Sequence, residues 1–250
     1  MLILTAALAV VIGLALGLLG GGGSILTVPL LVYVAGMAPK PAIASSLFIV
    51  GTTALAAVVQ HARAGRVRWR TGVIFGLSAM AGAYLGGRLA AYVPGQWLLV
   101  GFALMMLATA WAMIRGRKER ADAPERHELP VLLVLAEGVV VGLVTGIVGA
   151  GGGFLVVPAL VLLGGLPMSV AVGTSLLVIA MKSFAGLAGY LASVQIDWRT
   201  TLLVTGIAVL GSIIGGRFAG RIPGEVLRKG FGWFVLAMGT FVLVQSALGH

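Results

Sequence analysis

Long apolar runs, separated by short polar or glycine-rich breaks, follow one another along almost the whole chain. Each run approaches the roughly 20 residues that an α-helix needs to cross a bilayer. A transmembrane β-barrel would instead show short alternating segments, which the chain lacks. Because a backbone in lipid must satisfy its own hydrogen bonds, the pattern predicts an all-α polytopic membrane protein. The expected long helices cover residues 1–19, 42–60, 71–92, 95–114, 130–148, 170–192, 200–220 and 224–247.

Two further apolar pieces, 24–36 and 153–166, are too short to be ordinary spans. Each has about 13 residues and extends about 20 Å, whereas the hydrocarbon core is about 30 Å thick. Both follow a glycine run that ends a long helix. We therefore predict half-helices or re-entrant segments, in addition to eight full spans.

Three landmarks of the first half recur in the second half at a constant offset of 129 residues. The matched segments are GLALGLLGGGGSILTVPLLV from Gly13 and GLVTGIVGAGGGFLVVPALV from Gly142, VRWRT and IDWRT, and GAYLGGRLAAYVPG from Gly82 and GSIIGGRFAGRIPG from Gly211. Unrelated glycine-rich segments would not keep one spacing at separate landmarks. We predict two homologous repeats of about four spans and one half-helix each, 1–114 and 130–250, joined by a cytoplasmic linker, 115–129.

The composition supports a membrane protein, because 60% of the residues are hydrophobic and only 10% are charged. Soluble domains are about 45–50% apolar and about 25% charged. The net charge of +10 could indicate a nucleic-acid partner, but most charges lie in two short loops, 61–70 and 115–128. Basic loops of this kind mark the cytoplasmic side of a membrane protein. No nucleic-acid partner is expected.

The relative orientation of the two repeats can be inferred from the same charges. Two spans separate the two basic loops, so both lie on one side. The equivalent of the first loop in the second half, 193–199, carries one Asp and one Arg, and the basic residues follow the next span instead. This reversal favours inverted repeats, which need an odd number of crossings per half, so the two short pieces would then have to cross as well. Parallel repeats with four crossings each remain the alternative.

The paired glycine runs are the first candidate site. Backbone groups freed at membrane depth are tolerated only where they are buried in protein or line a cavity, and matched interruptions in two halves indicate a transporter's substrate site. The short helices would direct N–H groups towards an anion there. Close helix packing is the alternative. The candidate substrate-binding residues are Gly20, Gly21, Gly22, Gly23, Ser24, Gly149, Gly151, Gly152 and Gly153.

Lys182 lies in the middle of an expected span, where a charge is costly and normally faces a partner or a wet cavity. It could attract an anion or act as a proton-linked switch, or it could bond structurally to carbonyls of a broken helix. Its counterpart is Thr53, so the site would be asymmetric. Hydroxyls on this helix and on its counterpart in the first half could donate to an oxyanion or bond to their own helices. They belong to Ser45, Ser46, Thr53, Thr174 and Ser175.

Three charged residues are candidates for gating or coupling. Arg88 and Arg217 hold equivalent places near helix ends, where they could capture an anion or anchor the helix at the interface. Glu137, within an apolar span, is a candidate proton carrier. His61, beside the first basic loop, is expected at the interface. No motif of an enzyme or a metal site is visible, so neither cofactor nor metal is expected.

The segments GLLGGGGSILTVPLL and AIASSLFIV, followed by GLVTGIVGAGGGFLVVPAL and AVGTSLLVI, resemble the TauE/SafE sulfite exporter family over nearly the whole chain. The resemblance implies a carrier of the bacterial or archaeal cytoplasmic membrane that moves sulfite, sulfonates or related small anions, usually outward. It carries over to the two glycine runs with Pro29 and Pro158, and to the hydroxyl segments at Ser45–Ser46 and Thr174–Ser175.

These observations together predict a secondary transporter of small sulfur-containing anions that works by alternating access, and not an enzyme. Its expected partners are the anion and the lipid bilayer, with protons as the candidate coupling ion and a homodimer as the candidate assembly. An anion channel and a non-transport membrane assembly subunit are the alternatives.

Overall fold

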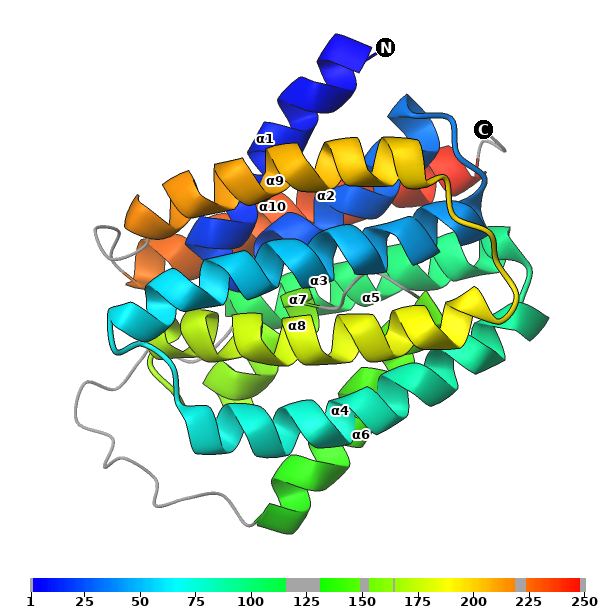
Figure 1. Ribbon diagram of the computed structural model, residues 1–250. Helices are drawn as coiled ribbons and strands as arrows, with labels where there is room; N and C mark the ends of the chain where they lie inside the picture. Colours follow the sequence, from blue (N-terminus) through cyan, green and yellow to red (C-terminus); the bar gives the residue numbers. More distant parts are fainter. Residues whose placement is uncertain (1, 116–130, 149–152, 164, 219–223, 248–250) are drawn as a thin grey trace.

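The structure is a computed structural model that describes residues 2–115, 131–148, 153–163, 165–218 and 224–247, and the elements in these ranges are all helical (Figure 1). The long helices are α1 (Leu2–Leu19), α3 (Pro39–Arg63), α4 (Trp69–Leu89), α5 (Gly95–Arg115), α6 (Val131–Val148), α8 (Met168–Leu191), α9 (Trp198–Phe218) and α10 (Gly224–Ala247). They match the predicted runs to within three residues at each end, so the all-α polytopic fold is confirmed. The predicted linker, apart from Arg115, lies outside the described residues.

The two short pieces have the same construction. A 3₁₀ turn over Gly20–Gly23 leads into α2 (Ser24–Pro29), and a π-helical turn, Leu30–Val34, completes the first piece. In the second, a π-helical turn, Ala159–Leu163, follows α7 (Gly153–Pro158). Each α-helical part ends at a proline, which cannot donate the next backbone hydrogen bond, and the wider turn follows.

The first short piece folds back along the helix that precedes it. Gly23 lies against backbone atoms of Ile12 and Leu16 in α1, so the chain reverses at the glycine run. From Ser24 to Val34 the piece extends about 16 Å at 1.5 Å per residue, which is about half the thickness of the hydrocarbon core. The long helix and the short piece therefore form a helical hairpin, and the re-entrant course in the membrane stays a prediction.

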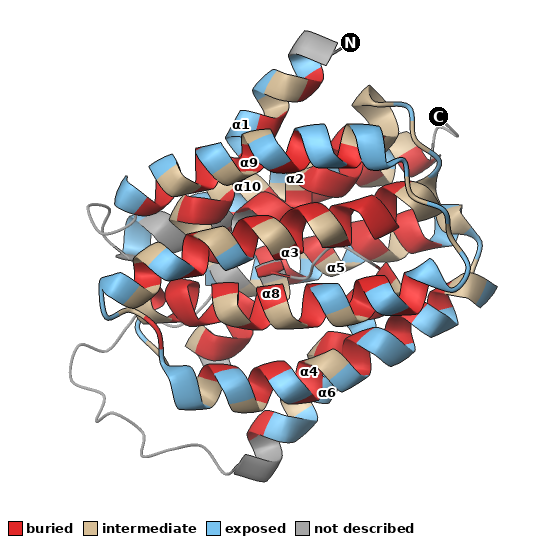
Figure 2. Cartoon of the chain, in the orientation of Figure 1, coloured by how far each residue is buried: buried red, intermediate tan, exposed pale blue. Residues whose placement is uncertain are grey.

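Helices α3 and α8 form the centre of the bundle and run antiparallel. Gly51 packs against Ser183, whereas Gly173 packs against His61, so early residues of one helix face late residues of the other. Both helices are largely buried, as Figure 2 shows. They occupy equivalent places in the two proposed repeats, and inverted repeats require this opposed course. The repeat organisation itself, with its division into 1–114 and 130–250, stays a prediction.

Close glycine crossings join the two halves. Helix α1 packs on α9, where Gly13 lies against Ala208 and Gly17 against Ser212. In the equivalent crossing, α6 packs on α4, and Gly142 lies against Ala79. In each crossing a Cβ on the glycine would overlap main-chain atoms of the partner helix. Small residues that let two backbones approach closely are a common basis of helix association in membranes.

Replacing Gly142 with leucine is expected to destabilise the protein, because the new side chain would overlap the backbone of Ala79. Overpacking of this kind typically costs about 1–3 kcal/mol. The unfolding temperature in detergent should fall by several degrees. The matched control is Gly101→Leu, because a Cβ at Gly101 would approach nothing closer than 3.9 Å. Equal melting temperatures for the two variants would contradict the importance of this crossing.

Local capping explains where some of the long helices begin. Helix α3 starts with Pro39, whose missing N–H is harmless in a first turn. Helix α9 follows Asp197, whose carboxylate accepts hydrogen bonds from the N–H of Arg199 (3.1 Å) and from the Thr200 hydroxyl (2.6 Å). The bonds from Thr200 are the main reason why the pKa of Asp197 lies below its ordinary value. The carboxylate therefore fixes the turn that leads into α9.

Five helices in the described ranges are long and apolar enough to cross a membrane, and they belong to α3, α4, α5, α8 and α9. The described apolar stretches of α1, α6 and α10 are shorter, so the count of eight full spans stays a prediction.

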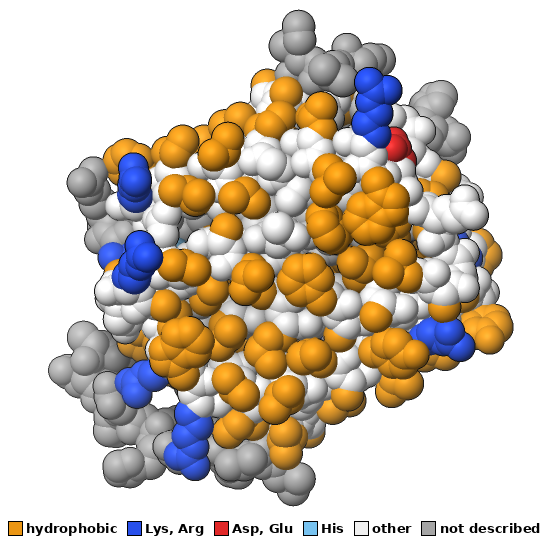
Figure 3. All heavy atoms as spheres, in the orientation of Figure 1, with side chains coloured by type: hydrophobic (Ala, Val, Ile, Leu, Met, Phe, Trp, Pro, Cys, Tyr) orange, Lys and Arg blue, Asp and Glu red, His pale blue; other side chains and the backbone are white. Residues whose placement is uncertain are grey.

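Figure 3 shows a broad apolar face with Lys and Arg side chains near its two ends. Helices α3 and α9 run parallel, since Ser45 contacts Thr201 and Gln60 contacts Gly216. Their shared end carries Arg63 and Arg217, a concentration that is typical of the cytoplasmic side.

Candidate functional site

The two glycine breaks meet beside the middle of α8. A Cβ added to Gly153 would overlap the Cα of Gly21 and stand 2.7 Å from Cδ1 of Ile179, which lies halfway along α8. A Cβ on Gly20 would stand 2.8 Å from Oγ of Ser175. Gly20 also has a φ of 66°, which favours glycine. The structure therefore brings predicted residues of both halves together on one helix face.

Lys182 lies on the same face of α8 as these contacts. Ser175, Ile179 and Lys182 are separated by four and three residues, the spacing of neighbours on one side of a helix. Lys182 is about 5 Å further along the axis than Ile179. The backbone of Lys182 is thus within about one helical turn of the place where the breaks meet.

The Lys182 ammonium has a neutral partner. Its Nζ donates a hydrogen bond to Oγ1 of Thr145 on α6 at 2.8 Å, and the Thr145 hydroxyl lies 3.2 Å from the Gly142 carbonyl oxygen. The Lys182 side chain is 1% exposed. No Asp or Glu side chain is buried in the described ranges, and no salt bridge there involves this lysine. A buried lysine with a hydroxyl partner and no carboxylate lacks the counter-charge that its charged form requires.

The equivalent place in the first half has no charge. Thr53 corresponds to Lys182, and Leu16 stands where the second half has Thr145. Thr53 is fully buried, and its Oγ1 has no hydrogen-bond partner. The polar pair is therefore present only once, and the predicted asymmetry is visible in the side chains.

Three of the predicted hydroxyls bond to carbonyls of their own segments. Ser24 donates to Gly21 at 2.6 Å, Ser46 to Ile43 at 2.7 Å and Ser175 to Val172 at 2.8 Å. This is the bonding that the sequence left open as the structural alternative. Each hydroxyl would have to rotate before it could donate to an anion.

Ser45 and Thr174 connect helices. Oγ of Ser45 lies 2.9 Å from Oγ1 of Thr201, within hydrogen-bond distance, and Thr174 accepts a hydrogen bond from the Arg68 N–H at 3.0 Å. Ser45 therefore faces α9, and Thr174 faces the start of α4. The proposed role of Ser45 and Thr174 as substrate ligands stays a prediction, and these contacts with other helices do not support it.

The remaining predicted glycines fall into two groups. Gly22 and Gly23 belong to the 3₁₀ turn, and Gly23 packs on α1. Gly149, Gly151 and Gly152 lie outside the described residues.

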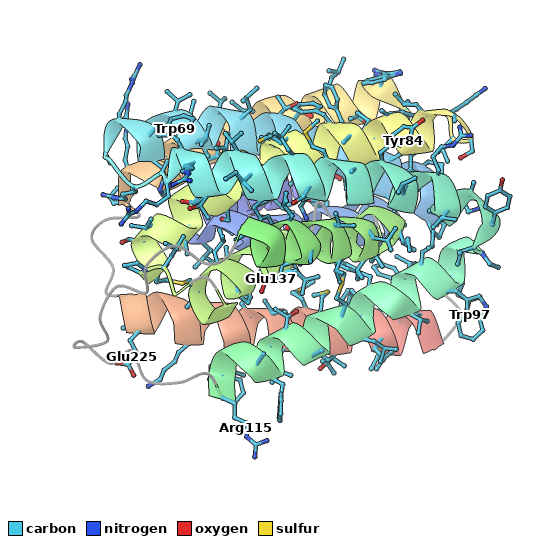
Figure 4. All side chains as sticks on the ribbon, turned by 90° about the horizontal axis from the view of Figure 1, so that it is seen from below. Trp69, Tyr84, Trp97, Arg115, Glu137 and Glu225 are labelled. Atoms are coloured by element: carbon cyan, nitrogen blue, oxygen red, sulfur yellow. The ribbon has the colours of Figure 1, made fainter. Side chains whose placement is uncertain are left out.

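The three candidate gating residues lie apart from Lys182. Arg88 and Arg217 are exposed in the last turns of α4 and α9. Glu137 is half-buried on α6, about 12 Å along the axis from Thr145. In Figure 4 it lies on the side of α6 that faces α5 and α10. Their roles in gating or coupling stay predictions.

Sequence reasoning overlooked two residues near the breaks and the bonding of a third. Thr145 holds Lys182, and its one sequence signal is that the other half has Leu16 in its place. Tyr190 donates to the Ile147 carbonyl at 2.6 Å. His61 lies in the last turn of α3 beside the basic loop, but it is 1% exposed within the protein and its Nε2 lies 3.1 Å from the Gly17 carbonyl, so its place at the membrane interface stays a prediction. These partners lie far apart in the chain, so local patterns do not reveal them.

Comparison with known proteins identifies relatives along almost the whole chain. The family model described as "Sulfite exporter TauE/SafE" matches residues 5–242. A "Probable membrane transporter protein" of Xylella fastidiosa is 37% identical, and the match covers 94% of this chain and 92% of the relative. The "Probable membrane transporter protein YunE" of Bacillus subtilis is 29% identical, with 88% of each chain covered. No solved structure matches significantly.

Proposed function

Because this chain belongs to the TauE/SafE sulfite exporter family, whose relatives are named membrane transporters, we propose that it is a secondary carrier of small sulfur-containing oxyanions. Sulfite and organosulfonates are the proposed substrates, and export through a prokaryotic cytoplasmic membrane is the proposed direction. Protons are the proposed coupling ion, and a homodimer is the proposed assembly.

The buried Lys182 is the observation that supports an anionic substrate. A charge deep in a membrane protein needs a partner, and Lys182 has a threonine hydroxyl at 2.8 Å with no buried carboxylate among the described residues. A bound oxyanion would complete the ion pair. The two glycine breaks meet within about one turn of Lys182 along α8, and they would offer backbone groups to the remaining oxygens.

The opposed course of α3 and α8 supports alternating access. These equivalent helices cross near their middles, so the proposed site lies between the two halves. In inverted-repeat carriers, one bundle rocks against the other around a site at the bilayer midplane. We propose the same movement here, with Lys182 exposed in turn to each side.

Counterflow in proteoliposomes tests this function. Purified protein should give saturable sulfite exchange that internal sulfite accelerates, and taurine, thiosulfate and sulfoacetate define the substrate range. Protein-free liposomes are the control. Flux without saturation or counterflow would indicate an anion channel. Absence of flux, together with a bound protein after purification from native membranes, would indicate an assembly subunit.

A further inference from the structure

Two aromatic side chains bond to the helix ends that precede the glycine breaks. Tyr190 donates from its hydroxyl to the carbonyl of Ile147, near the end of α6, at 2.6 Å. His61 Nε2 lies 3.1 Å from the carbonyl of Gly17, near the end of α1. A carbonyl can only accept, so Nε2 carries the proton in this hydrogen bond. Both donors are almost fully buried, with 0% and 1% of their surfaces exposed.

The two donors hold equivalent positions at opposite ends of the bundle, and their acceptors are offset by one residue, since Gly17 corresponds to Gly146. His61 and Tyr190 are 129 residues apart, the repeat offset, and each lies in the last turn of a central helix, α3 or α8. Because these helices run antiparallel, the His61 contact lies at the end with Arg63 and the Tyr190 contact at the other end. In each half, a hydrogen bond thus joins the central helix to the helix that precedes the glycine break, α3 to α1 and α8 to α6.

We propose that His61 and Tyr190 are positioning residues for transport, each holding one end of the carrier closed. This inference rests on the proposed alternating access. A buried carbonyl without a donor is costly, whereas the same carbonyl in an open, hydrated end can bond to water. Breaking one contact therefore favours the conformation in which that end is open. Loss of the His61 contact opens the end with the basic loops, and loss of the Tyr190 contact opens the other.

The two contacts, His61 with Gly17 and Tyr190 with Ile147, differ in strength. The Tyr190 side chain has one polar atom, its hydroxyl oxygen, and this atom is hydrogen-bonded. Buried Nδ1 of His61 has no hydrogen-bond partner, so opening lets it gain one from water. The end with His61 should therefore open at a lower cost than the end with Tyr190.

Single-cysteine labelling tests the proposal, because the chain has no cysteine of its own. Ser175→Cys reports on the half near His61, since Gly173 packs against that residue, and Ser46→Cys reports on the equivalent place near the other end. A membrane-impermeant thiol reagent is applied from the near side of each reporter. With Tyr190→Phe, the cysteine of Ser46→Cys should be labelled about fivefold faster, and the cysteine of Ser175→Cys more slowly. His61→Phe should have the opposite effect on the two labelling rates.

His61→Tyr is the matched control, because it restores a hydroxyl donor of the kind that serves at position 190. It should keep both labelling rates near those of the unmodified background. Equal changes of both reporters, or none, in His61→Phe and Tyr190→Phe would overturn the proposal. So would a His61→Tyr variant that behaves as His61→Phe. Labelling needs no substrate. Opposite changes in the two labelling rates, in a protein whose unsubstituted form shows no sulfite counterflow, would support the role of the two contacts and refute the proposed substrate.

Discussion

Replacing Lys182 with methionine is expected to lower saturable sulfite exchange in proteoliposomes by about 100-fold. The variant keeps a long side chain in a fully buried place and removes the ammonium that we propose as the counter-charge of the anion. A hydrogen bond to a charged group contributes about 1.5–3 kcal/mol, which corresponds to about a 10- to 150-fold change in affinity. Loss of the charge in a water-poor site places the effect near the upper end of this range.

Two further variants separate the buried charge from charge in general. Lys229→Met also removes one positive charge, but Lys229 is exposed and pairs with Glu225 at 2.9 Å, so exchange should stay near the wild-type rate. Lys182→Arg keeps the charge and should retain part of the exchange. Unchanged sulfite exchange by Lys182→Met would remove Lys182 from the proposed mechanism, provided that the purified variant elutes as a single folded species.

The helices themselves were predictable because lipid makes hydropathy decisive. A run such as 170–192 has few structures open to it in a membrane, and α8 spans Met168–Leu191. The short pieces were predictable for the same reason, since Ser24–Val34 is apolar yet too short to cross. The opposed orientation of equivalent helices had only the loop charges as a signal. Charge bias records sidedness, so it could favour inversion without showing which helices pack together.

The bonding of side chains was much less predictable. A serine in a membrane helix can donate to its own backbone, to another helix or to a substrate, and the sequence is the same in each case. Ser46 bonds within α3, whereas its neighbour Ser45 bonds to α9. The burial of His61 depends on the end of α1 lying beside the end of α3, and no local sequence pattern encodes this contact. Thr145 could have been inferred only from its mismatch with Leu16.

Glycine serves two purposes in this chain. It allows continuous helices to cross closely, and it allows the two interrupted segments to meet. At the crossings, Gly13 and Gly142 allow two continuous helices to touch. At the breaks, Gly20 and Gly153 allow two interrupted segments from different halves to meet beside α8. The first use determines stability. The second determines the shape of the space in which we propose that the anion binds.

Replacing Gly153 with alanine is therefore expected to abolish most of the transport, by about 100-fold, while the protein still inserts and purifies. The added Cβ would overlap the Cα of Gly21, and a main-chain atom cannot move aside as the end of a side chain can. The two breaks would have to separate beside Ile179. A shift of about 1 Å in groups that position a substrate can lower rates about 100-fold. Initial rates of sulfite counterflow, measured over a range of concentrations, would show the loss.

Gly206→Ala is the matched control, because it adds the same methyl group to a helical glycine with nothing within 4 Å. It should transport at the wild-type rate. Binding of sulfite to detergent-solubilised protein, followed as a rise in unfolding temperature, separates the two ways in which Gly153→Ala could fail. Loss of this rise in a variant that still elutes as a folded species would place the defect at the site. Normal counterflow by Gly153→Ala would show that the meeting of the breaks is helix packing alone, and the glycine runs would no longer support a substrate site.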